Sequence, residues 1–192
     1  MTDAEQQLLE ILKKRSFRRA EPGKMFQLVS GEMSEYFIDG KMTAVSSEGA
    51  GLIGEVIYDW TKDAGLDAIG GLQVGAVPLT AAAVISYQHH GRPIEGFWVR
   101  EEIKSHGTQK LIEGGLRKGM RVAVVDDVFT KGGSALKAVE AVRAFGCEVV
   151  LVLGLVDRLR GAKELFQRNG ITDYRAVFTI RNFGIDVPAD EG

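Results

Sequence analysis

The stretch Val122-Ala-Val-Val-Asp-Asp-Val-Phe-Thr-Lys-Gly-Gly-Ser134 decides the fold of this chain. Its first four residues are apolar without polar alternation, which is typical of a strand covered on both faces of a parallel sheet. Two acids follow, and a stretch rich in glycine and hydroxyl groups then opens an amphipathic helix. We expect this turn at the carboxyl end of the strand, because that edge of an α/β sheet is where ligands bind.

The elements around this stretch alternate between strand and helix. After Gly133 the apolar residues recur at helical spacing, Gly146 ends the predicted helix, and a second apolar strand completes a right-handed crossover. We expect helices near 3–15, 47–64, 77–90, 133–146 and 160–169, and strands near 25–29, 35–39, 67–71, 94–100, 121–126, 148–156 and 174–180. This order predicts a single α/β domain over 1–192, with a mostly parallel sheet flanked by helices. A small amino-terminal hood and helix would occupy about 1–45, and the core about 46–182.

The turn after the strand is suited to a sugar phosphate. Backbone N–H groups and hydroxyls at a helix start, here Thr130 and residues 132–134, favour a phosphate group. Asp126 and Asp127 would repel a phosphate, but their carboxylates are good acceptors for ribose hydroxyls. The turn alone leaves a simpler interpretation open, in which the acids cap the helix and the glycines only turn the chain.

The whole stretch resembles the phosphoribosyl-pyrophosphate (PRPP) motif of type I phosphoribosyltransferases. Residues 99–114, Val-Arg-Glu-Glu-Ile-Lys-Ser-His-Gly-Thr-Gln-Lys-Leu-Ile-Glu-Gly, resemble the catalytic loop of the orotate phosphoribosyltransferase family. Residues 26–39 resemble that family's amino-terminal substrate segment, and residues 70–78 resemble its pyrophosphate loop. The likeness runs from about residue 20 to 180 and implies the type I phosphoribosyltransferase fold.

The resemblance implies transfer of ribose 5-phosphate from PRPP to N1 of orotate, giving orotidine 5'-phosphate and pyrophosphate in pyrimidine biosynthesis. It implies Mg²⁺ carried by PRPP without direct protein ligation, and catalytic roles for Lys104, His106, Asp126 and Asp127. The implied PRPP contacts are the loop cations, the acids and the turn: Arg100, Lys104, His106, Asp126, Asp127, Val128, Phe129, Thr130, Lys131, Gly132, Gly133 and Ser134. The implied orotate contacts are Thr130, Arg158, Tyr36 and Phe37. Without the resemblance, Arg158 could equally pair with Asp157 or Glu164, and the two aromatic residues could belong to the core.

The segment from Glu101 to Gly119 is rich in glycine and has little apolar periodicity, which favours a lid. Cations on such a lid would stabilise the negative charge that grows on departing pyrophosphate, and closure would exclude water from the electrophilic ribose. The alternative, taken without the other motifs, is a solvated charged hairpin. The resemblance further implies a homodimer in which each lid acts in the neighbouring site.

The chain departs from the family pattern at three places. Glu101 stands where many members have a lysine, Val29 replaces another lysine, and Gln73-Val74 replaces a Tyr-Lys pair. The site therefore offers fewer cations than usual. Lower affinity for PRPP, a different base, or compensation by magnesium and Lys41 or Lys110 could each follow.

Composition narrows the remaining function classes. The chain has 192 residues, is 45% hydrophobic and has a net charge of −2, which argues against nucleic-acid binding. The alternative of a non-catalytic regulator that senses PRPP would require a DNA-binding extension and a basic face. The net charge of −2 shows no excess of basic residues, which argues against that alternative. Cys147 is the single cysteine, and no apolar run approaches the roughly 18 residues of a membrane span. We therefore expect a cytoplasmic enzyme with small-molecule substrates.

Two further patterns are weaker candidates for a site. The glycines over 49–54 have the spacing of a dinucleotide site, but Ser46 before them is typical of a helix cap, so close helix packing is the better interpretation. His89 and His90 lack metal-ligand spacing to other His or Cys residues, and we expect them to end a surface helix.

Overall fold

A computed structural model describes residues 1–27, 31, 33–101 and 110–187. Its central sheet has six strands in the order β10-β9-β8-β5-β6-β7, and only the edge strand β7 is antiparallel to its neighbour. The strands are β5 (Ala68–Leu72), β6 (Glu95–Val99), β7 (Ile112–Gly114), β8 (Arg121–Phe129), β9 (Glu148–Asp157) and β10 (Tyr174–Thr179). The expectation of an α/β protein with a mostly parallel sheet is confirmed.

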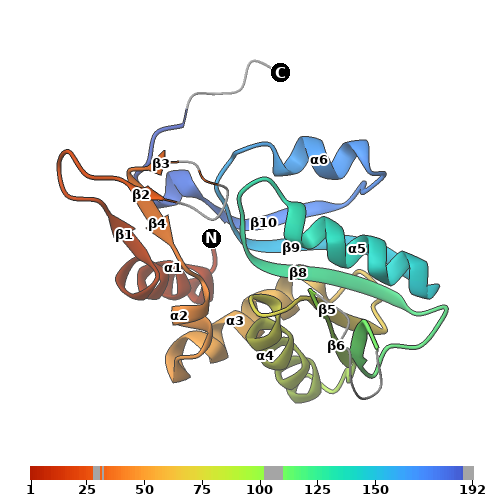
Figure 1. Ribbon diagram of the computed structural model, residues 1–192. Helices are drawn as coiled ribbons and strands as arrows, with labels where there is room; N and C mark the ends of the chain where they lie inside the picture. Colours follow the sequence, from red (N-terminus) through yellow and green to blue (C-terminus); the bar gives the residue numbers. More distant parts are fainter. Residues whose placement is uncertain (28–30, 32, 102–109, 188–192) are drawn as a thin grey trace.

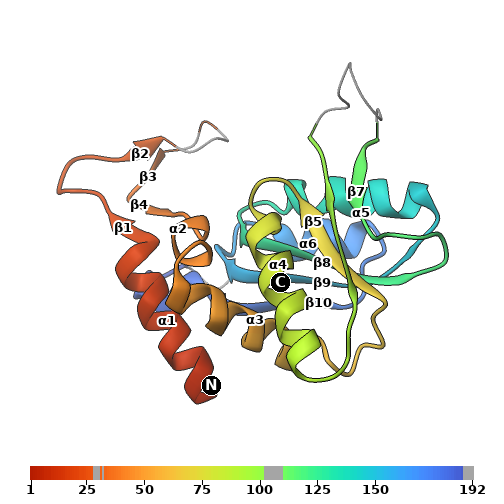
Figure 2. The ribbon, with the colours of Figure 1, turned by 90° about the horizontal axis from the view of Figure 1, so that it is seen from below.

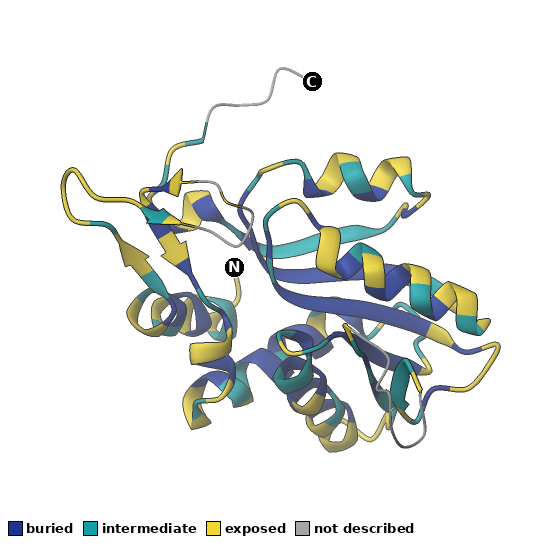
Figure 3. Ribbon diagram, viewed as in Figure 1, coloured by how far each residue is buried: buried dark blue, intermediate teal, exposed yellow. Residues whose placement is uncertain are grey.

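Helices cover both faces of the sheet, as Figure 1 shows. One face carries α3 (Ser47–Thr61) and α4 (Ala76–His89), with α1 (Asp3–Arg15) packed on α3, and the other carries α5 (Gly133–Phe145) and α6 (Ala162–Arg168). On β8, Val122 and Val124 pack with the α5 side while Ala123 and Val125 pack with the α3 side. This alternation explains why the run has no polar member, and Figure 3 shows the strands buried between the helix layers.

The order of the strands creates a topological switch point between β5 and β8. The chain runs from β5 through α4 to β6 in one direction along the sheet, and from β8 through α5 to β9 in the other. The loops after β5 and β8 therefore diverge, which leaves a crevice at the carboxyl ends of these strands. Ligands are expected there.

A small hood precedes the core and lies beside these carboxyl ends (Figure 2). It contains two antiparallel pairs, β1 (Phe17–Arg19) with β4 (Tyr36–Ile38) and β2 (Phe26–Gln27) with β3 (Met33–Ser34), followed by α2 (Lys41–Ala44). Helix α1 begins with a capping box between Thr2 and Glu5 and buries Leu8 and Leu12. The amphipathic amino-terminal helix therefore docks on its own chain.

The structure corrects several predicted boundaries. Strand β8 continues to Phe129, beyond the predicted end near 126, so both acids belong to the strand. Part of the predicted lid is β7, because Ile112–Gly114 pair with β6. The short elements β1, β3, α2, β7 and the 3₁₀ helix η1 (Ile180–Phe183) were not predicted, since elements of two to four residues have no periodicity to detect. The predicted strand over 25–29 is Phe26–Gln27, and its last two residues lie outside the described ranges.

The glycines over 49–54 serve helix packing, as expected. The Ser46 hydroxyl accepts the Gly49 N–H at 3.1 Å and caps α3. A Cβ on Gly54 would lie 2.6 Å from the Ala82 carbonyl oxygen, so this glycine lets α3 and α4 approach closely. Helix α4 ends at His89, as predicted. None of the helices in the described part of the chain could cross a membrane.

Candidate active site

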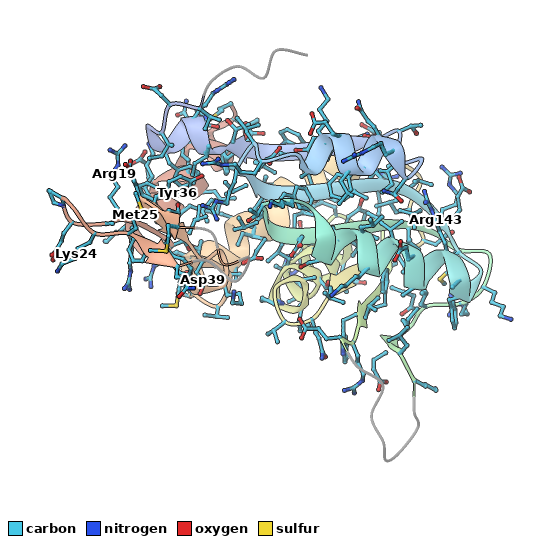
Figure 4. The ribbon with its side chains drawn as sticks, turned by 45° about the horizontal axis from the view of Figure 1, so that its top comes forward. Arg19, Lys24, Met25, Tyr36, Asp39 and Arg143 are labelled. Atoms are coloured by element: carbon cyan, nitrogen blue, oxygen red, sulfur yellow. The ribbon has the colours of Figure 1, made fainter. Side chains whose placement is uncertain are left out.

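A pocket of about 460 Å³ opens at the carboxyl end of β8, between the hood and the start of α5. In Figure 4, Tyr36 and Asp39 mark the part of the hood nearest the sheet, while Lys24 lies at its far tip. The pocket combines acids, cations and the glycine-rich turn, and it is lined by Phe37, Ile38, Asp39, Lys41, Asp126, Asp127, Val128, Thr130, Lys131, Gly132, Gly133, Ser134, Lys137 and Arg158.

Two buried carboxylates form one wall of the pocket. Asp126 and Asp127 are 7% and 8% exposed, and each accepts a backbone N–H at 3.0 Å. The Lys41 ammonium lies 3.8 Å from Asp127 Oδ2. Burial, and for Asp126 the neighbouring carboxylate as well, raises the pKa of both acids, while Lys41 opposes the rise at Asp127. Because charging these buried carboxylates costs free energy, hydrogen bonds from hydroxyl donors stabilise them strongly.

Two glycines bring other parts of the chain against these acids. A Cβ on Gly75, at the start of α4, would lie 2.7 Å from Asp127 Oδ1. A Cβ on Gly40, between the hood and α2, would lie 2.7 Å from the Asp127 Cβ atom. Three segments therefore meet at the acids, and any side chain at either glycine would occupy their space.

The turn after β8 has the form expected for a phosphate site. Gly132 adopts φ +77° and caps α5, and a Cβ there would lie 2.8 Å from the Phe166 ring. The position of a Cβ on Gly133 has no atom within 4 Å, so the helix start is open to the pocket. The side chain of Phe129 points away, since it is fully buried and packs against Phe166 and Tyr174.

Arg158 also lines the pocket and is 5% exposed. Its Nε–H donates to the Tyr36 hydroxyl at 3.2 Å, its Nη2 donates to Ser34 Oγ at 3.1 Å, and the guanidinium lies 4.5 Å from the centre of the Tyr36 ring. The alternative of an ion pair with Asp157 or Glu164 is wrong for the described part of the chain. Asp157 instead accepts the Tyr174 hydroxyl and the Leu159 N–H.

The structure separates the two aromatic candidates. Phe37 is 37% exposed and lines the pocket, whereas Tyr36 is 3% exposed and lies beneath Arg158. Ser34 was not expected from the sequence, and neither were Asp39 and Lys137 as lining residues. Asp39 directly follows β4, and this position at a strand end was the available signal.

The loop candidates are only partly described. Arg100 lies at the base of the β6–β7 hairpin, where its Nη2 donates to Glu113 at 2.9 Å. Lys104 and His106 lie outside the described residues, as does Val29. Glu101 is exposed, and Gln73-Val74 is joined by a cis peptide bond between β5 and α4.

The doubly covered sheet, the acid pair on β8 and the phosphate turn at the switch point together define a type I phosphoribosyltransferase. No protein-family model matches the chain. It is 45% identical over 180 residues to the orotate phosphoribosyltransferase of Bradyrhizobium sp. (strain ORS 278), covering 92% of this chain and 95% of the relative. It is 43% identical to that of Aquifex aeolicus, covering 88% and 92%.

Solved structures agree with this assignment. Orotate phosphoribosyltransferase of Mycobacterium tuberculosis, in complex with Fe(III) dicitrate, matches with a TM-score of 0.81 at 36% identity, covering 95% of this chain and 99% of that one. The same enzyme in complex with PRPP matches with a TM-score of 0.78 at 35% identity, with the same coverage. The chain belongs to the orotate phosphoribosyltransferase family. The predicted family and enzyme class are confirmed.

Proposed function

We propose that this chain transfers the 5-phosphoribosyl group of PRPP to N1 of orotate and releases pyrophosphate. One observation carries the proposal: a single pocket joins a buried acid pair and a phosphate turn to a buried guanidinium. PRPP supplies a phosphate and vicinal hydroxyls, and orotate supplies a carboxylate. The relative from Mycobacterium tuberculosis, crystallised with PRPP, supports the first half of this match.

On the PRPP side, the backbone N–H groups and hydroxyls of residues 130–134 would hold the 5'-phosphate at the start of α5. The ribose hydroxyls would donate to Asp126 and Asp127, in addition to the backbone N–H that each acid already accepts. As the bond to pyrophosphate breaks, positive charge develops on the ribose, and the adjacent carboxylates stabilise it.

On the base side, Arg158 would bind the orotate carboxylate through two donors, and Thr130 would contact the ring. Phe37 lines the same pocket with a half-exposed ring, on which a pyrimidine could stack. Tyr36 would act from beneath Arg158.

The leaving pyrophosphate requires cations. We assign Arg100, Lys104 and His106 to this task, on the family pattern, and expect a homodimer in which the loop reaches the neighbouring site. In the described part of the chain, no cluster of three or more acids, histidines or cysteines could hold a metal alone. The Mg²⁺ ion would arrive on PRPP without direct protein ligands, and it would offset the charge of the pyrophosphate. A cytoplasmic location belongs to the same proposal.

The test is the loss of orotate absorbance on adding PRPP and Mg²⁺, with each component omitted in turn. We expect turnover only in the complete mixture, and a loss of at least about tenfold in kcat/KM for orotate in Arg158→Ala, because a charged hydrogen-bonded pair is lost. Uracil, which lacks the carboxylate, is the matched control base. Efficient use of uracil but not orotate would favour the alternative, a phosphoribosyltransferase for another base.

A further inference from the structure

We infer that Ser34 and Tyr36 are positioning residues, which hold the Arg158 guanidinium so that its free edge selects a base carrying a carboxylate. The inference rests on the proposed function and adds the hood to the residues that decide the base. It starts from the fact that a buried arginine at the pocket wall is held by two neutral hydroxyls.

The two hydroxyls occupy one particular edge of the guanidinium. Tyr36 accepts from Nε at 3.2 Å and Ser34 accepts from Nη2 at 3.1 Å, and these two nitrogens form the side-on edge. The end-on edge, made by Nη1 and the second hydrogen on Nη2, has no protein acceptor in the described part of the chain. An arginine fork of this kind matches the two oxygens of a carboxylate.

The hydroxyl of Ser34 has a fixed orientation. Its Oγ donates to the Tyr36 carbonyl at 2.7 Å and accepts the Tyr36 N–H at 3.3 Å. Because its single hydrogen is already used, only a lone pair can face Arg158. Ser34 is 7% exposed, so water does not compete freely for this contact.

The backbone of Arg158 is fixed from the core side. Its N–H donates to the Phe129 carbonyl at 2.9 Å. The next residue, Leu159, adopts φ +56°, and its N–H donates to Asp157 Oδ1 at 2.8 Å. Asp157 is held in turn by the Tyr174 hydroxyl of β10. The left-handed region is strained for a leucine, so the surrounding contacts must determine this turn.

Because its two partners are neutral, the charge of Arg158 remains available to attract an anionic base. The pocket contains Asp39, Asp126 and Asp127, which repel an anionic base. If Arg158 were paired with a carboxylate of the protein, its attraction for the anionic base would be cancelled. The two hydroxyls instead solvate the guanidinium without neutralising its charge. A base without a carboxylate would leave the charge buried and unpaired. Selectivity for orotate over uracil therefore depends on how firmly the hood holds the guanidinium.

The variants Tyr36→Phe and Ser34→Ala, alone and together, test the inference. Both remove one hydroxyl, and Tyr36→Phe keeps the ring beneath Arg158. The matched controls are Tyr87→Phe and Ser86→Ala, which remove buried hydroxyls on α4 that bond to Thr61 and Glu55 at 2.8 Å. Initial rates are measured with orotate varied at saturating PRPP, with PRPP varied at saturating orotate, and with uracil as the base. Thermal unfolding of each variant checks folding.

We expect each single variant to raise KM for orotate about tenfold, the loss of one hydrogen bond to a charged group. KM for PRPP should change less than twofold, and the preference for orotate over uracil should fall about tenfold. The control variants should change none of these quantities. A KM for orotate within twofold of the wild type in folded Tyr36→Phe would overturn the inference, and so would an equal rise in both KM values. Wild-type protein that does not consume orotate at all would instead overturn the proposed function, and the inference with it.

Discussion

Replacing Asp126 with asparagine should lower activity and yet stabilise the fold. Asp126 is 7% exposed, and its nearest charged neighbour along the chain is the equally buried Asp127. Burial, together with that neighbour, raises the pKa of Asp126 to about 8. The folded protein therefore holds a proton, or bears an unfavourable charge, at a position where the unfolded chain ionises freely.

The sign and size of the effect follow from this pKa. Because the folded value is raised, the free energy of unfolding falls as the pH rises from about 4, the value in an unfolded chain, to about 8. Each pKa unit corresponds to about 1.4 kcal/mol, so the penalty at pH 7.5 is at most about 5 kcal/mol. Sharing of the proton with Asp127 reduces this penalty. We therefore expect the free energy of unfolding of Asp126→Asn to exceed that of the wild type by about 1–2 kcal/mol at pH 7.5.

Urea unfolding of the wild type and Asp126→Asn at pH 5 and pH 7.5 measures this gain, and the PRPP-dependent loss of orotate measures activity. The gain should shrink at pH 5, and kcat/KM for PRPP should fall at least about tenfold, because an acceptor for the ribose hydroxyls is weakened. The exposed Asp63→Asn is the matched control and should change neither quantity. A less stable variant at pH 7.5, or a gain that is independent of pH, would refute the reasoning.

Two further predictions concern the turn and the loop. Gly132→Ala should lower the free energy of unfolding by about 1–2 kcal/mol, since the φ of +77° at Gly132 and its 2.8 Å approach to Phe166 exclude a Cβ. Gly133→Ala is the control and should leave the free energy of unfolding unchanged, because a Cβ there meets no atom within 4 Å. Equal urea midpoints for the two variants would contradict this prediction. If the loop acts in the neighbouring site, mixing inactive Lys104→Ala and Asp127→Ala chains should restore part of the activity in the orotate assay. A mixture as inactive as either parent would count against that arrangement.

The central sheet could be predicted because its signals are local. The apolar run before Asp126 identified a doubly covered strand, and the change of period at Gly133 identified the helix that follows it. Both elements are present, as β8 and α5. The end of β8 was placed too early, because the sequence gives no sign that two acids can continue a buried strand.

The hood and its contacts with the pocket could not be predicted in the same way. Ser34 and Arg158 are separated by 124 positions in the chain, and their contact depends on how β3 docks beside the end of β9. Gly40 and Gly75 come together at Asp127 from two different segments, and neither lies in a pattern that marks a close approach. The sequence identified Arg158 as a candidate, but the neutral hydroxyls that hold it are visible only in the structure.

A crystal structure of the protein with PRPP, Mg²⁺ and orotate bound would test the central claim most directly. We predict the 5'-phosphate against the backbone N–H groups of residues 130–134, the ribose hydroxyls on Asp126 and Asp127, and the orotate carboxylate on the free edge of Arg158. PRPP bound in another cleft, or orotate bound without contact to Arg158, would contradict the account.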